Sequence, residues 1–112
     1  NIVLQSQIKA IEEIKPGMKT KEADALSRDY IKAHGYGNEF GHSLGHGIGL
    51  DIHEGPVLSK NTNDTVQVNN CVTIEPGIYV DGLGGVRIED DILITENGCE
   101  VFTKCTKDLI IL

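Results

Sequence analysis

Residues 40–56 read Phe40-Gly-His-Ser-Leu-Gly-His-Gly-Ile-Gly-Leu-Asp-Ile-His-Glu-Gly-Pro56 and carry three histidines, His42, His46 and His53, on a glycine-rich backbone. Imidazole is a common protein ligand for zinc, manganese, cobalt and iron, and glycine lets a backbone approach an ion closely. His42 and His46 are four residues apart, but each neighbouring glycine would cost a helix roughly 1 kcal/mol. We therefore expect a non-helical metal-binding segment, distinct from the helical His-Glu-x-x-His motif.

Two carboxylates follow in segments whose apolar residues alternate with polar ones. In segment 71–75 the apolar side chains share one strand face and Glu75 lies on the other. In segment 85–94, Glu89 lies opposite the apolar side chains in the same way. If the two polar faces meet, Glu75, Glu89 and His46 converge on a cation, because buried carboxylates without a partner are costly.

The residues before the histidine segment predict two amphipathic helices. The first ends at Lys15-Pro16-Gly17, and the second begins with Thr20 as a plausible cap and ends near Gly35. Apolar residues spaced three and four apart mark the face that each helix should bury. These expected stripes are Leu4, Ile8, Ile11 and Ile14 in the first helix, and Ala23, Leu26, Tyr30 and Ala33 in the second.

From Gly41 onward the period of the pattern changes to two, which is typical of strands. Segments 67–75, 85–95 and 100–104 alternate or are rich in β-branched residues, and Asn97-Gly98 is a strong hairpin turn between the last two. Two helices followed by antiparallel strands predict an α+β fold. The 112 residues suffice for one domain with a core of ordinary size.

Composition excludes several classes of partner. Seventeen acidic and ten basic residues give a formal charge of −7, which repels phosphate backbones, so we expect no nucleic-acid partner. No apolar run has the length of a membrane span, so no membrane association is expected. The three cysteines make a disulfide framework improbable and favour a cytoplasmic location.

Three motifs, in this order, closely resemble the pita-bread metallopeptidases, the family of methionine aminopeptidase, aminopeptidase P and prolidase. They are Gly45-His-Gly-Ile-Gly49 with His53-Glu54, then Thr73-Ile-Glu-Pro-Gly-Ile-Tyr79, and then Gly85-Val-Arg-Ile-Glu-Asp90. His42 and Arg87 are similar to positions of the Xaa-Pro branch, which comprises aminopeptidase P and prolidase. The choice between dipeptidase and aminopeptidase stays open.

The resemblance implies a dinuclear metallohydrolase with five protein ligands, two of them aspartates. The other three map onto His46, Glu75 and Glu89 as metal ligands. Glu75 would also shuttle the proton of the metal-activated water that attacks the peptide bond. Two divalent ions are implied as cofactors, with manganese favoured over cobalt or zinc.

Further roles follow from the resemblance for three residues near these ligands. His53 and His42 are expected to be catalytic and to contact the peptide, and Arg87 to bind substrate and orient Glu89. Proline-containing peptides are the implied substrates. The alternatives are methionine aminopeptidase-type activity and a non-catalytic pita-bread module that binds proteins.

Residues 1–112 are accordingly expected to form the C-terminal half of a metallopeptidase catalytic domain, without the N-terminal aspartate ligands. Such a fragment should be inactive alone. In the family two similar halves pack together, so this half is expected to expose an apolar surface and to form a homodimer or self-associate.

Simpler interpretations apply to several nearby residues. We expect His34 to be a surface residue and Tyr79 to belong to the core. Glu54 is as readily a structural carboxylate as a residue that supports the site. Arg87 has an alternative role as an ion-pair partner of Asp91 on the same strand face.

Overall fold

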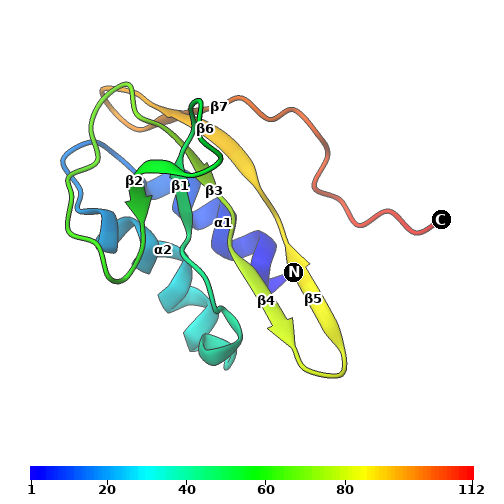
Figure 1. Ribbon diagram of the computed structural model, residues 1–112. Coiled ribbons are helices and arrows are strands. Elements are labelled where there is room, and N and C mark those ends of the chain that lie inside the picture. Colours follow the sequence, from blue (N-terminus) through cyan, green and yellow to red (C-terminus); the bar gives the residue numbers. More distant parts are fainter.

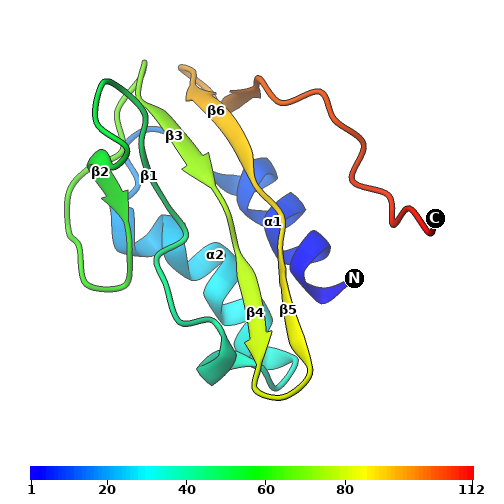
Figure 2. The same cartoon turned by 45° about the vertical axis from the view of Figure 1, so that its right-hand side comes forward.

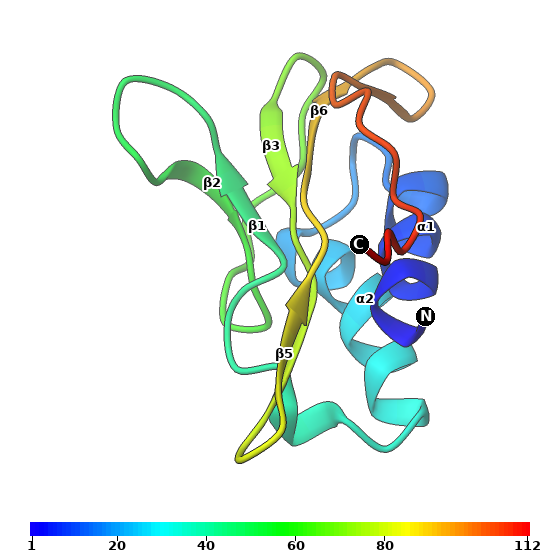
Figure 3. The same ribbon diagram turned by 90° about the vertical axis from the view of Figure 1, so that its right-hand side faces the viewer.

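The computed structural model describes residues 1–112 and begins with two helices. Helix α1 spans Ile2–Glu13 and α2 spans Thr20–Ala33, followed by a short 3-10 turn, η1, at Gly37–Glu39. Both helices lie on the same side of the strands, so the fold has one helical layer and one sheet layer (Figure 1, Figure 3). Neither helix has the length and apolar character needed to cross a membrane.

Seven strands follow the helices, and every pairing between them is antiparallel. Five form one sheet in the order β2-β1-β3-β6-β7, and β4 and β5 form a separate hairpin. This arrangement confirms the predicted α+β class. The strands are β1 Gly45–Gly47, β2 Glu54–Leu58, β3 Cys71–Ile74, β4 Gly77–Val80, β5 Gly84–Arg87, β6 Asp90–Ile94 and β7 Cys99–Val101.

The predicted buried stripe of α1 is wrong by one position over most of its length. Leu4, Ile8 and Ile11 are only partly buried. The face against the sheet consists instead of Val3, Ser6, Gln7 and Ala10, continued by the buried Ile14. Two of these residues are polar, which is why hydrophobic periodicity pointed to the neighbouring stripe.

Helix α2 also buries polar residues that periodicity missed. The Glu22 carboxylate accepts a hydrogen bond of 2.7 Å from the backbone N–H of Lys19 and so caps the first turn. Gly35 ends the helix with a positive φ of 88°. Ala23 is buried as predicted, Leu26 and Tyr30 are half-buried, and Ala33 is exposed. The inner face is completed by Thr20, Asp24, Ser27 and Ile31.

The segment 85–95 does not form one strand as predicted but two, β5 and β6, which belong to different sheets. Strand β3 continues into β4 across Glu75 and Pro76, and β5 continues into β6 across Ile88 and Glu89 (Figure 2). The β3–β4 segment and the β5–β6 segment therefore form one long hairpin, and its two arms bend at the same level. Val86 is 57% exposed, although it shares the alternation of buried Ile92 and Ile94.

The hydrophobic core lies between the helices and the five-stranded sheet. As the alternation predicts, Val72 and Ile74 of β3 are buried in it, together with Ile92 and Ile94 of β6. The turn at Asn97-Gly98 joins β6 to β7 as predicted. Beyond β7, the chain runs away from the helices and sheet toward its exposed end at Leu112 (Figure 1).

Candidate metal centre

Glu75 and Glu89 face each other where the long hairpin bends. Ile74 pairs with Asp90 in one sheet and Gly77 pairs with Arg87 in the other. The two pairs share one register, which sets Glu75 directly opposite Glu89. Like charges in this position are unfavourable in a sheet.

The electrostatics of Glu89 reflect that arrangement. Its pKa is raised above the ordinary value of 4.5, first by burial and then by the negative charge and hydrogen bonding of Glu75. Arg87 counters the rise in pKa without cancelling it.

His46 on β1 brings a nitrogen ligand to the same pair. Its Nδ1 lies 2.9 Å from the carbonyl oxygen of Gly47, and because a carbonyl only accepts, Nδ1 carries the proton. Its Nε2 lies 3.3 Å from a carboxylate oxygen of Glu75. An imidazole nitrogen and a carboxylate oxygen at this distance suit a shared cation.

Glycines on either side of His46 allow β1 to sit this close to its neighbours. A Cβ atom on Gly45 would lie 1.8 Å from the carbonyl oxygen of Thr73, and one on Gly47 would lie 2.1 Å from that of Gly55. Thr73, which sequence reasoning did not single out, accepts a hydrogen bond of 3.1 Å from the backbone N–H of His46. Only glycine fits on both sides of this histidine.

His42 precedes β1 and contacts Tyr79, not the Glu75–Glu89 pair. Its Nδ1 donates to the carbonyl of Ser43 at 2.8 Å, so its Nε2 accepts from the Tyr79 hydroxyl at 3.1 Å. The expectation that Tyr79 belongs to the core is wrong, because its side chain is 41% exposed. The sequence signal that could have shown this exposure was the alternation of side chains along β4, where Tyr79 lies opposite Gly85.

His53 ends the loop between β1 and β2, and Glu54 is the first residue of β2. The ring of exposed His53 packs edge-on against that of His46, with centroids 4.5 Å apart. Glu54 accepts a hydrogen bond of 3.1 Å from the backbone N–H of Asp51. The structure thus gives Glu54 a role in shaping the loop and sets His53 beside His46.

Arg87 lies near Glu89, with Nε 3.9 Å from a carboxylate oxygen. The Arg87 side chain is 53% exposed, so this contact is screened by water. The alternative ion pair with Asp91 does not form. Arg87 therefore has free donors that face the solvent side of the site.

The ligands do not form a complete metal site within this chain. No group of three His, Cys, Asp or Glu side chains is gathered closely enough to hold an ion. The structure brings the predicted ligands together as two adjacent pairs, His46 with Glu75 and Glu75 with Glu89. Their donor chemistry, one imidazole nitrogen and two carboxylates, fits a divalent ion that takes its remaining ligands from other groups.

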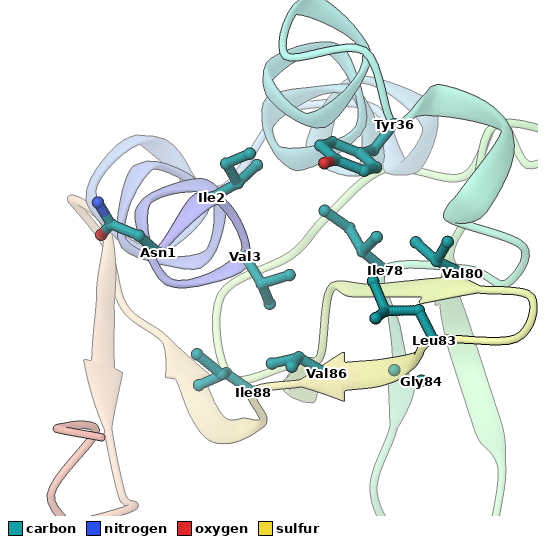
Figure 4. A pocket seen from close by; sticks show the side chains of 11 residues that line it. Asn1, Ile2, Val3, Tyr36, Ile78, Val80, Leu83, Gly84, Val86 and Ile88 are labelled. Atoms are coloured by element: carbon teal, nitrogen blue, oxygen red, sulfur yellow. The ribbon is translucent and has the colours of Figure 1, made fainter. Parts of the chain in front are cut away.

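An apolar cavity of about 520 Å³ lies on the other side of the bend. Figure 4 shows it between the start of α1, which contributes Ile2 and Val3, and the β4–β5 hairpin. Tyr36 closes one end, and Leu83 at the hairpin tip is 84% exposed. None of the candidate metal ligands lines this cavity.

Comparison with known proteins assigns the family. The model of metallopeptidase family M24 matches residues 1–96. The chain belongs to metallopeptidase family M24. As an M24 chain, it is 52% identical over 109 residues to the Xaa-Pro dipeptidase of Pyrococcus furiosus, with 97% of this chain and 31% of that protein aligned.

Solved structures of the M24 family agree with this fold. An Xaa-Pro dipeptidase from Bacillus anthracis is 56% identical and covers all of the chain with a TM-score of 0.98. An X-Pro aminopeptidase from Thermotoga maritima is 43% identical, with 99% of the chain covered and a TM-score of 0.94. The chain covers 32% of each of these structures, and the expected pita-bread arrangement is confirmed.

Proposed function

We propose that this chain contributes part of the metal centre of a peptidase that cleaves Xaa-Pro bonds. The observation that supports the proposal is the approach of His46 Nε2 to the Glu75 carboxylate at 3.3 Å, with Glu89 opposite Glu75 on the paired strand. The names of the similar proteins, Xaa-Pro dipeptidase and X-Pro aminopeptidase, support the substrate class. Between the two, dipeptidase is favoured because the more similar relatives carry that name.

In this proposal His46, Glu75 and Glu89 hold two divalent ions, with manganese favoured over cobalt and zinc. Bound ions would lower the pKa of a shared water and polarise the scissile carbonyl. Glu75, which lies next to the other two ligands, would accept a proton from the attacking water and return it to the leaving amine, as the family resemblance implies.

The remaining residues of the site would bind and orient the peptide. His53 lies beside the ligand His46 with its ring exposed, where it can donate to the developing oxyanion. His42, which is hydrogen-bonded to Tyr79, would line the side of the site where the substrate binds. Arg87 balances the charge of Glu89 and faces solvent, from where it can also contact a substrate carboxylate.

Residues 1–112 would form one half of the catalytic domain in this proposal, with two aspartate ligands supplied from outside the chain. The chain alone should then be inactive, since it holds no complete ligand set. Its exposed apolar residues at Leu83 and Val86 support self-association of the isolated chain or a homodimer of the protein. Its three free cysteines are in keeping with a cytoplasmic location.

The test is hydrolysis of a glycyl-proline dipeptide by the protein that carries this chain, after removal of metal and again after addition of Mn²⁺. Activity should disappear with chelation and return with Mn²⁺. His46→Ala should abolish the Mn²⁺-dependent activity, whereas His34→Ala, an exposed histidine at the end of α2, should leave it unchanged. Metal-free protein with full activity would refute the proposal, and binding of Mn²⁺ without turnover would favour a non-catalytic module.

A further inference from the structure

Gln7 is a fully buried polar residue in the apolar face of α1. It is 0% exposed and lies in the helical stripe between Val3 and Ala10. Its Nε2 donates to the carbonyl of Ile74 and to that of Ile88, each at 3.3 Å. An amide nitrogen has two N–H groups, so these two acceptors use both and fix the orientation of the side chain.

The bend of the long hairpin explains why a donor is needed there. In the shared register Pro76 lies opposite Ile88, and the Ile88 N–H donates to the Pro76 carbonyl at 3.3 Å. A regular antiparallel pair would return a second hydrogen bond, but proline has no N–H. Gln7 supplies from the helix the donor that Pro76 cannot give to the Ile88 carbonyl.

Both acceptors directly precede a candidate metal ligand. Ile74 comes before Glu75 on one chain of the hairpin, and Ile88 comes before Glu89 on the other. The Gln7 amide therefore bridges the two backbones at the level where the two carboxylates emerge. No other side chain donates to either of these carbonyls.

The bridge has a cost in stability. The Oε1 atom of Gln7 is buried and accepts no hydrogen bond from the protein, and such an atom is unfavourable in a core. A methionine would fill a similar volume without this unpaired oxygen. The polar residue at this position is thus explained by the geometry it imposes on the hairpin rather than by packing.

We propose that Gln7 is a positioning residue that fixes the separation of the Glu75 and Glu89 carboxylates for metal binding. This inference rests on the proposed function, because it assigns both carboxylates to the metal centre. Gln7 itself touches neither metal nor substrate and acts only through the two backbone segments.

The test uses Gln7→Met in the protein that carries this chain, which removes both donors and the unpaired oxygen. Mn²⁺ affinity measured by calorimetry should fall on the order of 10- to 100-fold, as expected when groups that orient metal ligands are lost. In the metal-free protein, the amides of residues 88–90 should exchange with deuterium faster. Gln5→Met, the same change at an exposed position of α1, should alter neither quantity.

A second substitution separates positioning from general loosening of the core. Pro76→Ala in the Gln7→Met background restores a backbone N–H opposite Ile88, so it should recover most of the lost Mn²⁺ affinity. If Gln7→Met does not fold, Gln7→Leu, which also removes both donors and the unpaired oxygen, is measured in the same way.

Wild-type Mn²⁺ affinity in Gln7→Met, or a loss that Pro76→Ala leaves unchanged, would overturn the inference. If the wild-type protein binds no Mn²⁺, the proposed function fails, and the exchange experiment then decides about Gln7 alone. Faster exchange at residues 88–90 would support the Gln7 bridge between the two backbone segments, and unchanged exchange would refute it.

Discussion

Arg28 on α2 donates a hydrogen bond of 2.7 Å from Nη2 to the backbone carbonyl of His42. The same guanidinium donates to the Phe40 carbonyl at 2.9 Å and pairs with the buried carboxylate of Asp24. Asp24 in turn accepts from the backbone N–H of Leu44 at 3.0 Å. One ion pair on a helix therefore anchors the chain that leads into β1 and the candidate site.

Loss of Arg28 should be strongly destabilising. Arg28→Ala leaves the Asp24 carboxylate, which is 1% exposed, buried without its partner, and such losses typically cost about 3–5 kcal/mol. Urea unfolding of the protein measures this cost. Lys9→Ala breaks an exposed pair of the same i,i+4 spacing, with Glu13, and should cost about 0.5 kcal/mol or less. Equal costs for the two variants would contradict the anchoring role.

Gly45→Ala should disrupt the approach of β1 to β3. The added methyl group would lie 1.8 Å from the Thr73 carbonyl oxygen, so the strands must separate, and we expect a loss on the order of 3 kcal/mol in the free energy of unfolding. Gly41→Ala is the matched control, because no atom lies within 4 Å of its added Cβ. Thermal unfolding of the two variants compares them, and a stable Gly45→Ala would show that β1 lies farther from β3.

The raised pKa of Glu89 predicts a pH dependence of the stability of the metal-free protein. A carboxyl group whose pKa is higher in the folded than in the unfolded state favours folding when protonated. Its stabilising contribution is therefore complete below the ordinary value of 4.5 and is lost as the pH rises through the raised pKa. Glu89→Gln should remove this loss and make the metal-free protein more stable at neutral pH.

Urea unfolding of wild type and Glu89→Gln in the presence of a chelator, from acid to neutral pH, measures this effect. Glu96→Gln, an exposed carboxyl in the β6–β7 turn, serves as control and should leave the pH profile unchanged. If Glu89→Gln lowers the stability at neutral pH, the repulsion between Glu75 and Glu89 is not the dominant interaction of this pair.

Tyr79→Phe should weaken catalysis if the proposed function holds. The substitution removes the hydroxyl that donates to His42 Nε2 at 3.1 Å, which leaves the imidazole without its partner on β4. Loss of one hydrogen bond of this kind lowers kcat/KM for an Xaa-Pro dipeptide by roughly three- to tenfold. Tyr36→Phe is the control, because it changes a tyrosine outside the site. Equal kcat/KM values for the two variants would show that the hydrogen bond between Tyr79 and His42 does not contribute to catalysis.

The three cysteines should differ in reactivity. Burial raises the pKa of the Cys99 thiol above its ordinary value, and its Sγ donates to the Ile11 carbonyl at 3.3 Å. Cys105 is exposed. Because the thiolate is the reactive form, alkylation at neutral pH followed by peptide mass spectrometry should modify Cys105 first and Cys99 much more slowly. Rapid modification of Cys99 would mean that β7 opens readily from α1.

Much of this fold was predictable because it follows from local sequence patterns. The alternation of Val72 and Ile74 predicted the buried face of β3, and Asn97-Gly98 predicted the hairpin between β6 and β7. The glycines on both sides of His46 were expected to bring the backbone close to an ion, but in the structure they bring it close to the neighbouring strands. These features depend on residues near one another in the sequence, where periodicity and turn chemistry act directly.

The break at Ile88 and Glu89 was not predictable from alternation, because β5 and β6 keep one continuous period through it. What divides the sheet there is Pro76, a residue of the opposite strand that cannot donate to Ile88. The buried role of Gln7 was missed for a related reason, since a polar residue in a helix gives no periodic signal. Its acceptors lie 67 and 81 residues away in the chain.

The sequence by itself determined the two helices, the strands β3, β6 and β7, the family resemblance and the residue types of the candidate centre, because propensity, period and motif spacing are local properties. The tertiary structure alone decided that Glu75 lies opposite Glu89 and that His46 Nε2 turns toward Glu75. Those relationships depend on strand register and on hydrogen bonds between distant segments. Their energies come from burial and charge in the folded chain, which no window of the sequence contains.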